Sequence, residues 1–332
     1  MVTRVINDHY DEEKVQKAIA EALECFYKAL IAKIDSININ DIIKTKNPYL
    51  YRAKAMNKAY DIINSILQAF VSSSEETIFG NVFFEPLAIA ASNGKKSLAE
   101  GVDIDIADDA AKLQYAIAVK SGTSVFNADS KKRQAENFAR ARKLAAQGHY
   151  NFSAIIGYAY GTKQESDRGS AKIYIELAGE EFWTMLTGDK DFYKKIITFM
   201  GELPEKYVDD YNVSYDKACN RLVRDFSREF CNEDGSIDWE TLVDFNSGSP
   251  TRKSQERFKI CAKRLYAELQ KKPTAAKAKL CEDVGVGSSF LNKLLAWMED
   301  ERIIKKGYEG KKNGWTITGV LPFENDSENN SL

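Results

Sequence analysis

Histidine is scarce in this sequence of 332 residues, which contains only His9 and His149. Hydrolases of the Ser-His type and nucleases with a histidine base or metal ligand depend on an imidazole at the reacting centre. The composition therefore argues against these classes. His149 stands between a predicted helix and a predicted strand, and we interpret it as a packed loop residue rather than a catalytic base.

Cysteine is also uncommon, and its five copies lie far apart without a CxxC pair. This odd number and this spacing suggest neither a disulfide framework nor a zinc site. No apolar run approaches the roughly 18 residues that a membrane helix needs, and the first residues, MVTRVINDHYDEEK, are too charged for a secretory signal. Because 44% of the residues are hydrophobic and can form a core, we expect a soluble, cytoplasmic globular protein.

The net charge is −2, but the charges are distributed unevenly along the chain. Residues 250–320 contain sixteen Lys and Arg against eight Asp and Glu, so this segment carries +8 and the remainder −10. Such a basic segment predicts a polyanionic partner. A solvated, lysine-rich helix surface would give the same count and stays open as an alternative.

The N-terminal part of the chain has the spacing of helices. Apolar residues recur every three or four positions between residues 12 and 70, which predicts an N-terminal helical region over 1–70. The run Ser72–Glu76 resembles an N-cap with a capping box, so we expect a new helix to begin there. Asn93 and Gly94 are expected to end that helix.

Residues 102–119 change to a period of two, which predicts a β-hairpin. The alternating apolar residues are Val102, Ile104 and Ile106, then Tyr115, Ile117 and Val119. A helix over 130–147 and strands over 152–160 and 171–177 are expected to follow, with weaker helical patterns over 180–247. We therefore predict a mixed α/β core with a helical extension over 71–245.

The basic segment begins with NSGSPTRKS, residues 246–254, whose small polar residues and proline indicate a linker. Helical patterns at 258–270, 274–282 and 288–299 and strand-like runs at 302–306 and 315–318 predict a winged helix-turn-helix domain over 252–322. Its third helix would present Ser289, Asn292 and Lys293 to DNA, and its wing Lys311 and Lys312. Contact with a protein is the alternative, and residues 323–332 are expected to form a disordered polar tail.

The hairpin carries acids and a lysine that can converge. Asp103 and Asp105 share one face of the first strand because side chains alternate, while Lys120 ends the neighbouring strand. Phosphodiester hydrolysis needs carboxylates that hold a divalent cation and a lysine that orients water or stabilises charge on the phosphate. Oxygen ligands favour Mg²⁺, which Mn²⁺ can replace, over Zn²⁺. A structural ion pair between Asp103 and Lys120 is the alternative interpretation.

These residues resemble the PD-(D/E)XK nuclease superfamily, in which an acid on one strand is followed on the next by an acid, any residue and lysine. Asp103 matches the first acid and Lys120 the lysine, whereas Ala118 stands where the second acid would be. The resemblance implies catalytic roles for Asp103 and Lys120, and a substitute metal ligand, Glu85, from the preceding helix. Other acids that could serve as the substitute are Glu76, Glu100 and Asp105.

Three longer motifs are similar to the PmeII-like group of type II restriction endonucleases: NPYLYRAK at 47–54, SSSEETIFG at 72–80 and KSGTSVFNADSKKRQ at 120–134. The resemblance covers roughly residues 40–160. It implies a PD-(D/E)XK restriction-endonuclease-like core, with a mixed sheet flanked by helices, that cuts double-stranded DNA at a specific sequence with Mg²⁺ bound by Asp103 and Glu85. We expect a homodimer, because two-fold symmetry most simply explains paired cuts, and a restriction-modification system implies a prokaryotic cytoplasm.

The helix after Lys120 is basic. Lys131, Lys132 and Arg133 could hold the DNA backbone, the resemblance adds Gln134, and a solvated helix face is the alternative. Two other functions fit the same sequence. One is a DNA-binding regulator whose nuclease-like core has lost its chemistry, as Ala118 suggests, and the other is a repair nuclease that cuts branched DNA.

Overall fold

The computed structural model describes residues 5–163, 173–308 and 311–323, with the backbone alone at residues 253 and 311–313. The chain forms two compact units that interleave along the sequence. One unit contains residues 1–38 and 60–224, and the other contains residues 39–59 and 225–332. The sequence predicts where independently folding domains begin and end, and those boundaries stay a prediction.

A five-stranded mixed sheet forms the centre of the first unit. Its strands lie in the order of the sequence, and only the first two pairs, β1 with β2 and β2 with β3, are antiparallel. The strands are β1 (Lys95–Lys96), β2 (Ile104–Asp108), β3 (Leu113–Lys120), β4 (Asn151–Tyr158) and β5 (Tyr174–Ala178). The hairpin predicted from the period of two is confirmed, with Ile104 opposite Ile117. The mixed α/β core is confirmed as well.

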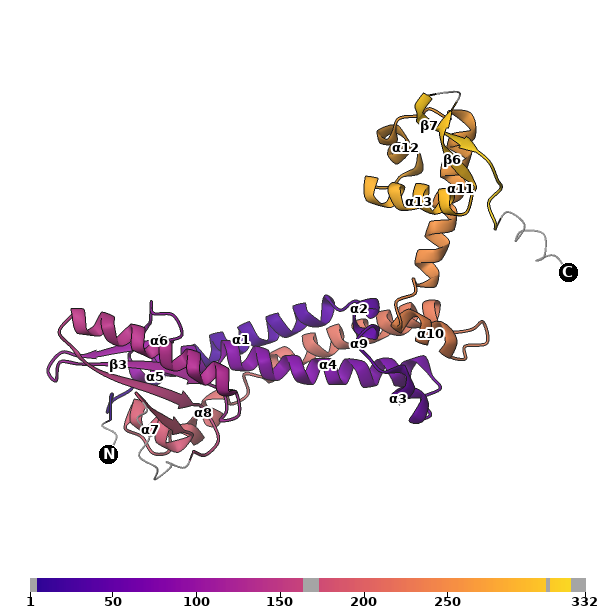
Figure 1. The fold of residues 1–332 in the computed structure, drawn as a ribbon. Helices are drawn as coiled ribbons and strands as arrows, with labels where there is room; N and C mark the ends of the chain where they lie inside the picture. The colour runs from indigo at the N-terminus through magenta and orange to yellow at the C-terminus, as the bar shows by residue number, and fades with distance from the viewer. Residues whose placement is uncertain (1–4, 164–172, 309–310, 324–332) are drawn as a thin grey trace. The chain divides into compact units, whose positions relative to one another are not determined.

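Helices cover both faces of this sheet (Figure 1). The elements on one face are α1 (Glu12–Asp35), α5 (Phe84–Ser92), α7 (Glu180–Thr187) and α8 (Phe192–Met200), and α6 (Ala128–Gln147) lies on the other. Ile104 and Ile117 face the first layer, whereas Ala116 and Ala118 face α6. Because the central strands are buried on both sides, their sequences read as nearly continuous apolar runs.

The helix expected to begin at Ser72–Glu76 does not begin there. These residues lie inside α4 (Ala59–Val82), which the buried side chains of Ile62, Ile66 and Val71 anchor along one side. The Ser74 hydroxyl donates to the Phe70 carbonyl at 2.8 Å, so the serine is satisfied within the helix instead of capping a new one. The predicted end at Asn93 is confirmed, since Asn93 has the left-handed φ of 55° that ends α5.

Three long helices of the first unit run side by side: α1, α4 and the part of α9 (Glu205–Phe230) up to Arg224 (Figure 1). The rings of Tyr27 and Tyr207 stack with centroids 5.0 Å apart, and the Ser214 hydroxyl donates to Asp35 at 2.7 Å. Since Val15 and Ile19 of α1 also belong to the core beneath the sheet, this helix joins the bundle to the sheet. None of the described helices is long and apolar enough to cross a membrane.

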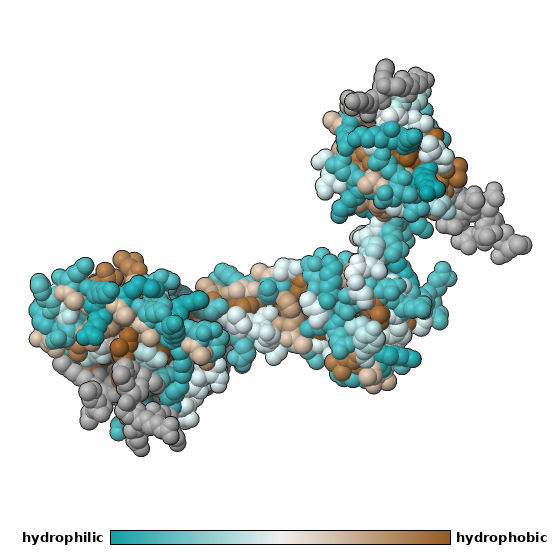
Figure 2. All heavy atoms as spheres, viewed as in Figure 1, coloured by the Kyte–Doolittle hydropathy of each residue, from teal (hydrophilic) through white to brown (hydrophobic). Residues whose placement is uncertain are grey.

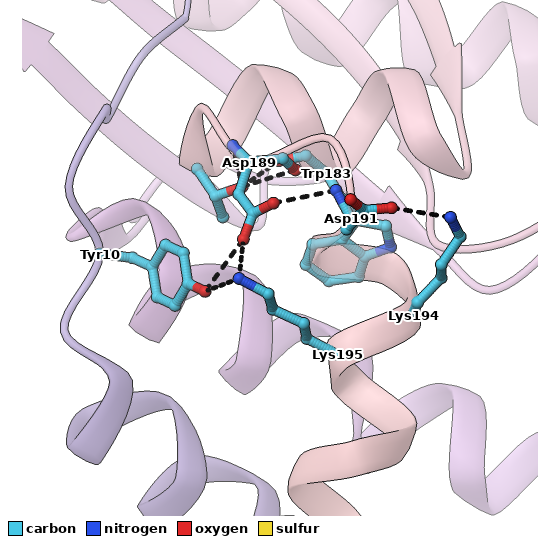
Figure 3. Close-up of polar contacts among 7 residues, drawn as sticks. Tyr10, Trp183, Asp189, Asp191, Lys194 and Lys195 are labelled. Atoms are coloured by element: carbon cyan, nitrogen blue, oxygen red, sulfur yellow. Dashed lines mark hydrogen bonds and ion pairs between the residues drawn. The ribbon is translucent and has the colours of Figure 1, made fainter.

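The N-terminal segment is held against the turn between α7 and α8 (Figure 3). The Asp189 carboxylate accepts hydrogen bonds from the Tyr10 hydroxyl at 3.1 Å and from the Lys195 ammonium at 2.6 Å. The Tyr10 ring packs edge-on against Phe192, and the Ile6 N–H donates to the Met185 carbonyl. The hydrogen bond between Tyr10 and Asp189 joins residues 179 positions apart.

The second unit begins with three short helices, α2 (Ile39–Ile43), α3 (Pro48–Ala53) and α10 (Trp239–Asn246). The Asn246 side-chain amide donates to the carbonyls of Ile43 and Lys46, and the Arg52 guanidinium lies over the Trp239 ring. Residues 246–254 were expected to form a linker, but only the part between α10 and Arg252 is irregular. Thr251 caps α11 (Arg252–Lys271), which therefore begins earlier than the predicted residue 258.

The rest of this unit, which we call the helix-hairpin module, contains α11, α12 (Lys277–Val284), α13 (Ser288–Asp300) and the antiparallel strands β6 (Ile304–Tyr308) and β7 (Lys311–Ile317). Its core includes Leu265, Leu280 and Leu294, all fully buried. The visible face is mainly hydrophilic (Figure 2). The tail expected at 323–332 lies outside the described residues except for Phe323, which packs against this core.

Candidate active site

Asp103 and Lys120 meet where β2 begins and β3 ends. The Asp103 carboxylate accepts the Val119 N–H at 2.7 Å and lies 3.4 Å from the Lys120 ammonium. The Asp103 N–H in turn donates to the Ile117 carbonyl, so the hairpin ladder sets the position of the acid. The side chains of Asp103 and Lys120 are 23% and 30% exposed, which leaves both accessible to a ligand.

Ala118 takes no part in this contact. It is fully buried in the core between the sheet and α6, where Phe138 and Ala141 also lie. A carboxylate at this position would be surrounded by apolar side chains, and a buried charge needs compensation. The hairpin therefore contributes one carboxylate beside Lys120 rather than two.

Glu85 reaches the same end of the sheet from the first turn of α5. Its carboxylate forms an ion pair with Lys96 of β1. The next residue, Ser97, donates its N–H to the Asp103 carbonyl at 3.0 Å. This backbone hydrogen bond places Lys96 close to Asp103. Glu85 chiefly, and Asp103 to a smaller extent, raise the pKa of the Lys96 ammonium. Lys96 thus lies within the electrostatic reach of both predicted metal ligands.

The donor set fits a hard divalent cation with few protein ligands. Among the residues that the structure describes, no three His, Cys, Asp or Glu side chains cluster closely enough to enclose a metal ion. Mg²⁺ commonly binds through one or two carboxylates and completes its shell with water and substrate phosphate oxygens. Glu85 and Asp103 could supply those two carboxylates, with Lys96 displaced toward solvent.

The other candidate acids lie in different surroundings. Glu100 pairs with Arg140 at 3.3 Å, and Asp105 accepts a weak hydrogen bond from Gln114 at 3.5 Å. Glu76 is exposed on α4. Asp103, which contacts Lys120, and Glu85 therefore remain the acids of the candidate site.

Two buried amides of α6 hold the turn that precedes Asp103. The Gln134 amide donates to the Gly101 carbonyl at 2.6 Å, and the Asn137 side chain lies where a Cβ on Gly101 would be. Gly101 has a φ of 71°, which glycine adopts without strain. Sequence reasoning missed Asn137, and the DNA contact expected for Gln134 stays a prediction. The feature of the sequence that pointed to this turn was Gly101, two residues before Asp103.

The basic residues at the start of α6 differ in their surroundings. Lys132 and Arg133 are exposed, whereas Lys131 lies 3.8 Å from the buried carboxylate of Glu176 on β5. Sequence reasoning also missed Glu176. Its signal was an acid within the otherwise apolar strand IYIELA.

The helix-hairpin module presents the predicted side chains of α13. Leu291, Leu294, Leu295 and Met298 are buried as the pattern predicted. Ser289, Asn292 and Lys293 are exposed, and Asn292 accepts a hydrogen bond from Lys277 at 2.8 Å. The side chains of Lys311 and Lys312 lie outside the described residues.

Comparison with known proteins identifies the family. A family model described as "Type II restriction endonuclease EcoO109I" matches residues 13–207, which is more than half of the chain and includes the whole sheet. No curated protein matches the chain. The matched range contains Glu85, Asp103 and Lys120 and ends before the helix-hairpin module. This chain therefore belongs to the EcoO109I family of type II restriction endonucleases.

Proposed function

We propose that this protein is a PD-(D/E)XK endonuclease of the PmeII-like group that hydrolyses double-stranded DNA at a specific sequence, with Mg²⁺ or Mn²⁺ as its metal. The family match supports DNA cleavage. The observation that carries the proposal is the contact at 3.4 Å between Asp103, directly before β2, and Lys120, at the end of β3.

Each residue has a distinct role in the proposed reaction. Asp103 and Glu85 would hold the metal, which when bound neutralises phosphate charge and lowers the pKa of water. The Val119 N–H keeps the Asp103 carboxylate oriented toward Lys120. The Lys120 ammonium orients the attacking water and stabilises the charge that develops on the phosphate.

DNA binding would involve both units. Lys131, Lys132 and Arg133 would contact backbone phosphates. The helix-hairpin module would act as a winged helix-turn-helix domain that reads bases through α13 and its exposed residues Ser289, Asn292 and Lys293, with Lys311 and Lys312 on the wing. Two copies of the chain would make the paired cuts.

The test is cleavage of plasmid and genomic DNA, methylated and unmethylated, in Mg²⁺. We expect discrete fragments from the wild type and none after chelation of the metal. Lys120→Ala should abolish cleavage and retain DNA binding, whereas Lys112→Ala, which removes an exposed lysine at the hairpin turn, should cut normally. Cleavage of branched DNA without sequence preference would instead identify a repair nuclease.

The alternative is a DNA-binding regulator without nuclease activity. The buried Ala118, in place of a second acid beside Lys120, favours it. Wild-type protein that binds DNA but cuts none of these substrates would establish the regulator and overturn the nuclease.

A further inference from the structure

Glu176 is a buried acid on the face of the sheet that α6 covers. It lies opposite Ile156 in the β4–β5 ladder, and Ile156 packs in the core beneath α6. Its side chain is only 6% exposed. The Tyr158 hydroxyl donates to this carboxylate at 2.7 Å. A buried carboxylate is costly unless hydrogen bonds and an opposite charge compensate it.

Two lysines from different segments compensate this acid. The ammonium of Lys163, after β4, lies 3.2 Å from Glu176, and that of Lys131, near the start of α6, lies 3.8 Å away. Lys163 also lies over the Tyr158 ring, 5.2 Å from its centroid. Glu176 is the acid with which both lysines pair in the described part of the chain. Among the described residues, two ammonium groups thus face this carboxylate.

The lysines remain open to solvent and lie near the candidate active site. Their side chains are 39% exposed at Lys131 and 24% at Lys163. Tyr158 pairs with Lys120 across the β3–β4 ladder, and β5 is the next strand. Glu176 lies two strands from Lys120, about 9.6 Å, and its ladder partner Ile156 lies two residues before Tyr158, about 6.7 Å along the strand, so the two Cα atoms are about 12 Å apart. One strand of DNA rises about 3.4 Å per nucleotide along the helix axis, so this span corresponds to about three to four nucleotides.

We propose that Lys131 and Lys163, held by Glu176, form a binding site for a backbone phosphate of the DNA strand that passes Lys120. The inference rests on the proposed function. An ammonium group has three donors, so a lysine can bond Glu176 and a phosphate at once. Glu176 is a positioning residue: it holds the two long side chains in place before DNA arrives, which lowers the entropy cost of binding.

The test is the salt dependence of DNA binding. Binding of a fluorescent random-sequence duplex is measured by anisotropy in EDTA, which prevents cleavage, over a series of salt concentrations. Lys163→Met should reduce the slope of log K against log salt by about 0.9, the value for one phosphate contact, and weaken binding several-fold at low salt. Lys163→Arg should restore the slope. The control Lys143→Met removes an exposed lysine of α6, the helix that carries Lys131, and should leave the slope unchanged.

A thermal unfolding scan accompanies each variant. If Lys163→Met does not fold, the double variant Glu176→Gln/Lys163→Met, which removes the acid together with one cation, takes its place and should lose the same slope. A folded variant with the wild-type slope overturns the inference even when the wild type cuts DNA. A wild type that neither binds nor cuts DNA overturns the proposed function, and this inference with it.

Discussion

Single residues at the hairpin illustrate how backbone geometry prepares a side chain for chemistry. The Asp103 carboxylate is oriented by a backbone donor, the Val119 N–H, rather than by another side chain. A backbone donor in a ladder moves little, so the carboxylate keeps its direction toward Lys120. A fixed direction of the Asp103 carboxylate matters in a site to which Ala118 contributes no second acid.

Asp103→Asn should abolish most of the cleavage without unfolding the protein. The amide oxygen can still accept the Val119 N–H, but the charge that would bind the metal is lost. Groups that stabilise charge at a reacting centre typically contribute about 10²–10³-fold, and we expect a loss in that range in Mg²⁺. Asp109→Asn, at an exposed position, is the control. A variant that cuts at the wild-type rate would remove Asp103 from the site.

The contact between Asp189 and Lys195 should be sensitive to acid. The hydrogen bond from Lys195 is the largest factor that lowers the pKa of this carboxyl from 3.8. Because its pKa is lower in the folded than in the unfolded protein, Asp189 contributes stability above about pH 4 that is lost as pH falls through the folded pKa. Asp189→Asn should therefore lower the Tm at pH 7, and the difference from wild type should shrink as the pH falls below about 4.

Thermal unfolding between pH 7 and pH 2 measures this effect. Asp191→Asn is the matched control, because Asp191 forms an exposed pair with Lys194. Its Tm should follow that of the wild type at every pH. A constant difference between Asp189→Asn and wild type across the range would contradict the role of the charge.

At the scale of elements, α6 does more than cover the sheet. Its buried face carries polar side chains, Gln134 and Asn137, among the apolar ones that pack on the strands. Both reach Gly101, two residues before Asp103. Through these two side chains, α6 holds the turn before β2 in place.

Gly101→Ala should destabilise the first unit by about 2–3 kcal/mol. The added methyl would overlap the Asn137 amide, and the positive φ adds about 1 kcal/mol of backbone strain. Gly285→Ala, also at a positive φ but with open space where the methyl would be, should cost the strain alone. Denaturant unfolding measures both. Adding Asn137→Ala to Gly101→Ala should cost less than the sum of the single changes, and strict additivity would exclude the overlap.

At the scale of the whole molecule, the sheet and the helix-hairpin module have separate cores. Leu294 belongs to the core of the helix-hairpin module, and Ile117 to the core beneath the sheet. Leu294→Ala should cost about 2–5 kcal/mol in its own module. Hydrogen exchange should then lose protection in α11–α13 and β6–β7 and keep it in β3 and β4. Equal loss in the sheet would show that the units unfold together.

Sequence reasoning identified those features that depend on near neighbours. The period of two over residues 102–119 predicted the hairpin that joins Asp103 to Lys120, and the helical period predicted the buried face of α13. The predicted helix start at Ser72–Glu76 was wrong, because serines that resemble a cap are equally satisfied inside α4 when apolar residues before and after them pack on one side.

The sequence by itself determined the local periodicity, the charge of the C-terminal segment and the spacing that resembles a nuclease. Only the tertiary structure decided which distant residues meet: Glu85 with Lys96, Gln134 with Gly101, and Glu176 with Lys131 and Lys163. The physical reason is that a repeat of two or 3.6 residues sets the face on which a side chain lies. The partner across that face depends on how whole elements pack, which no short stretch of sequence contains.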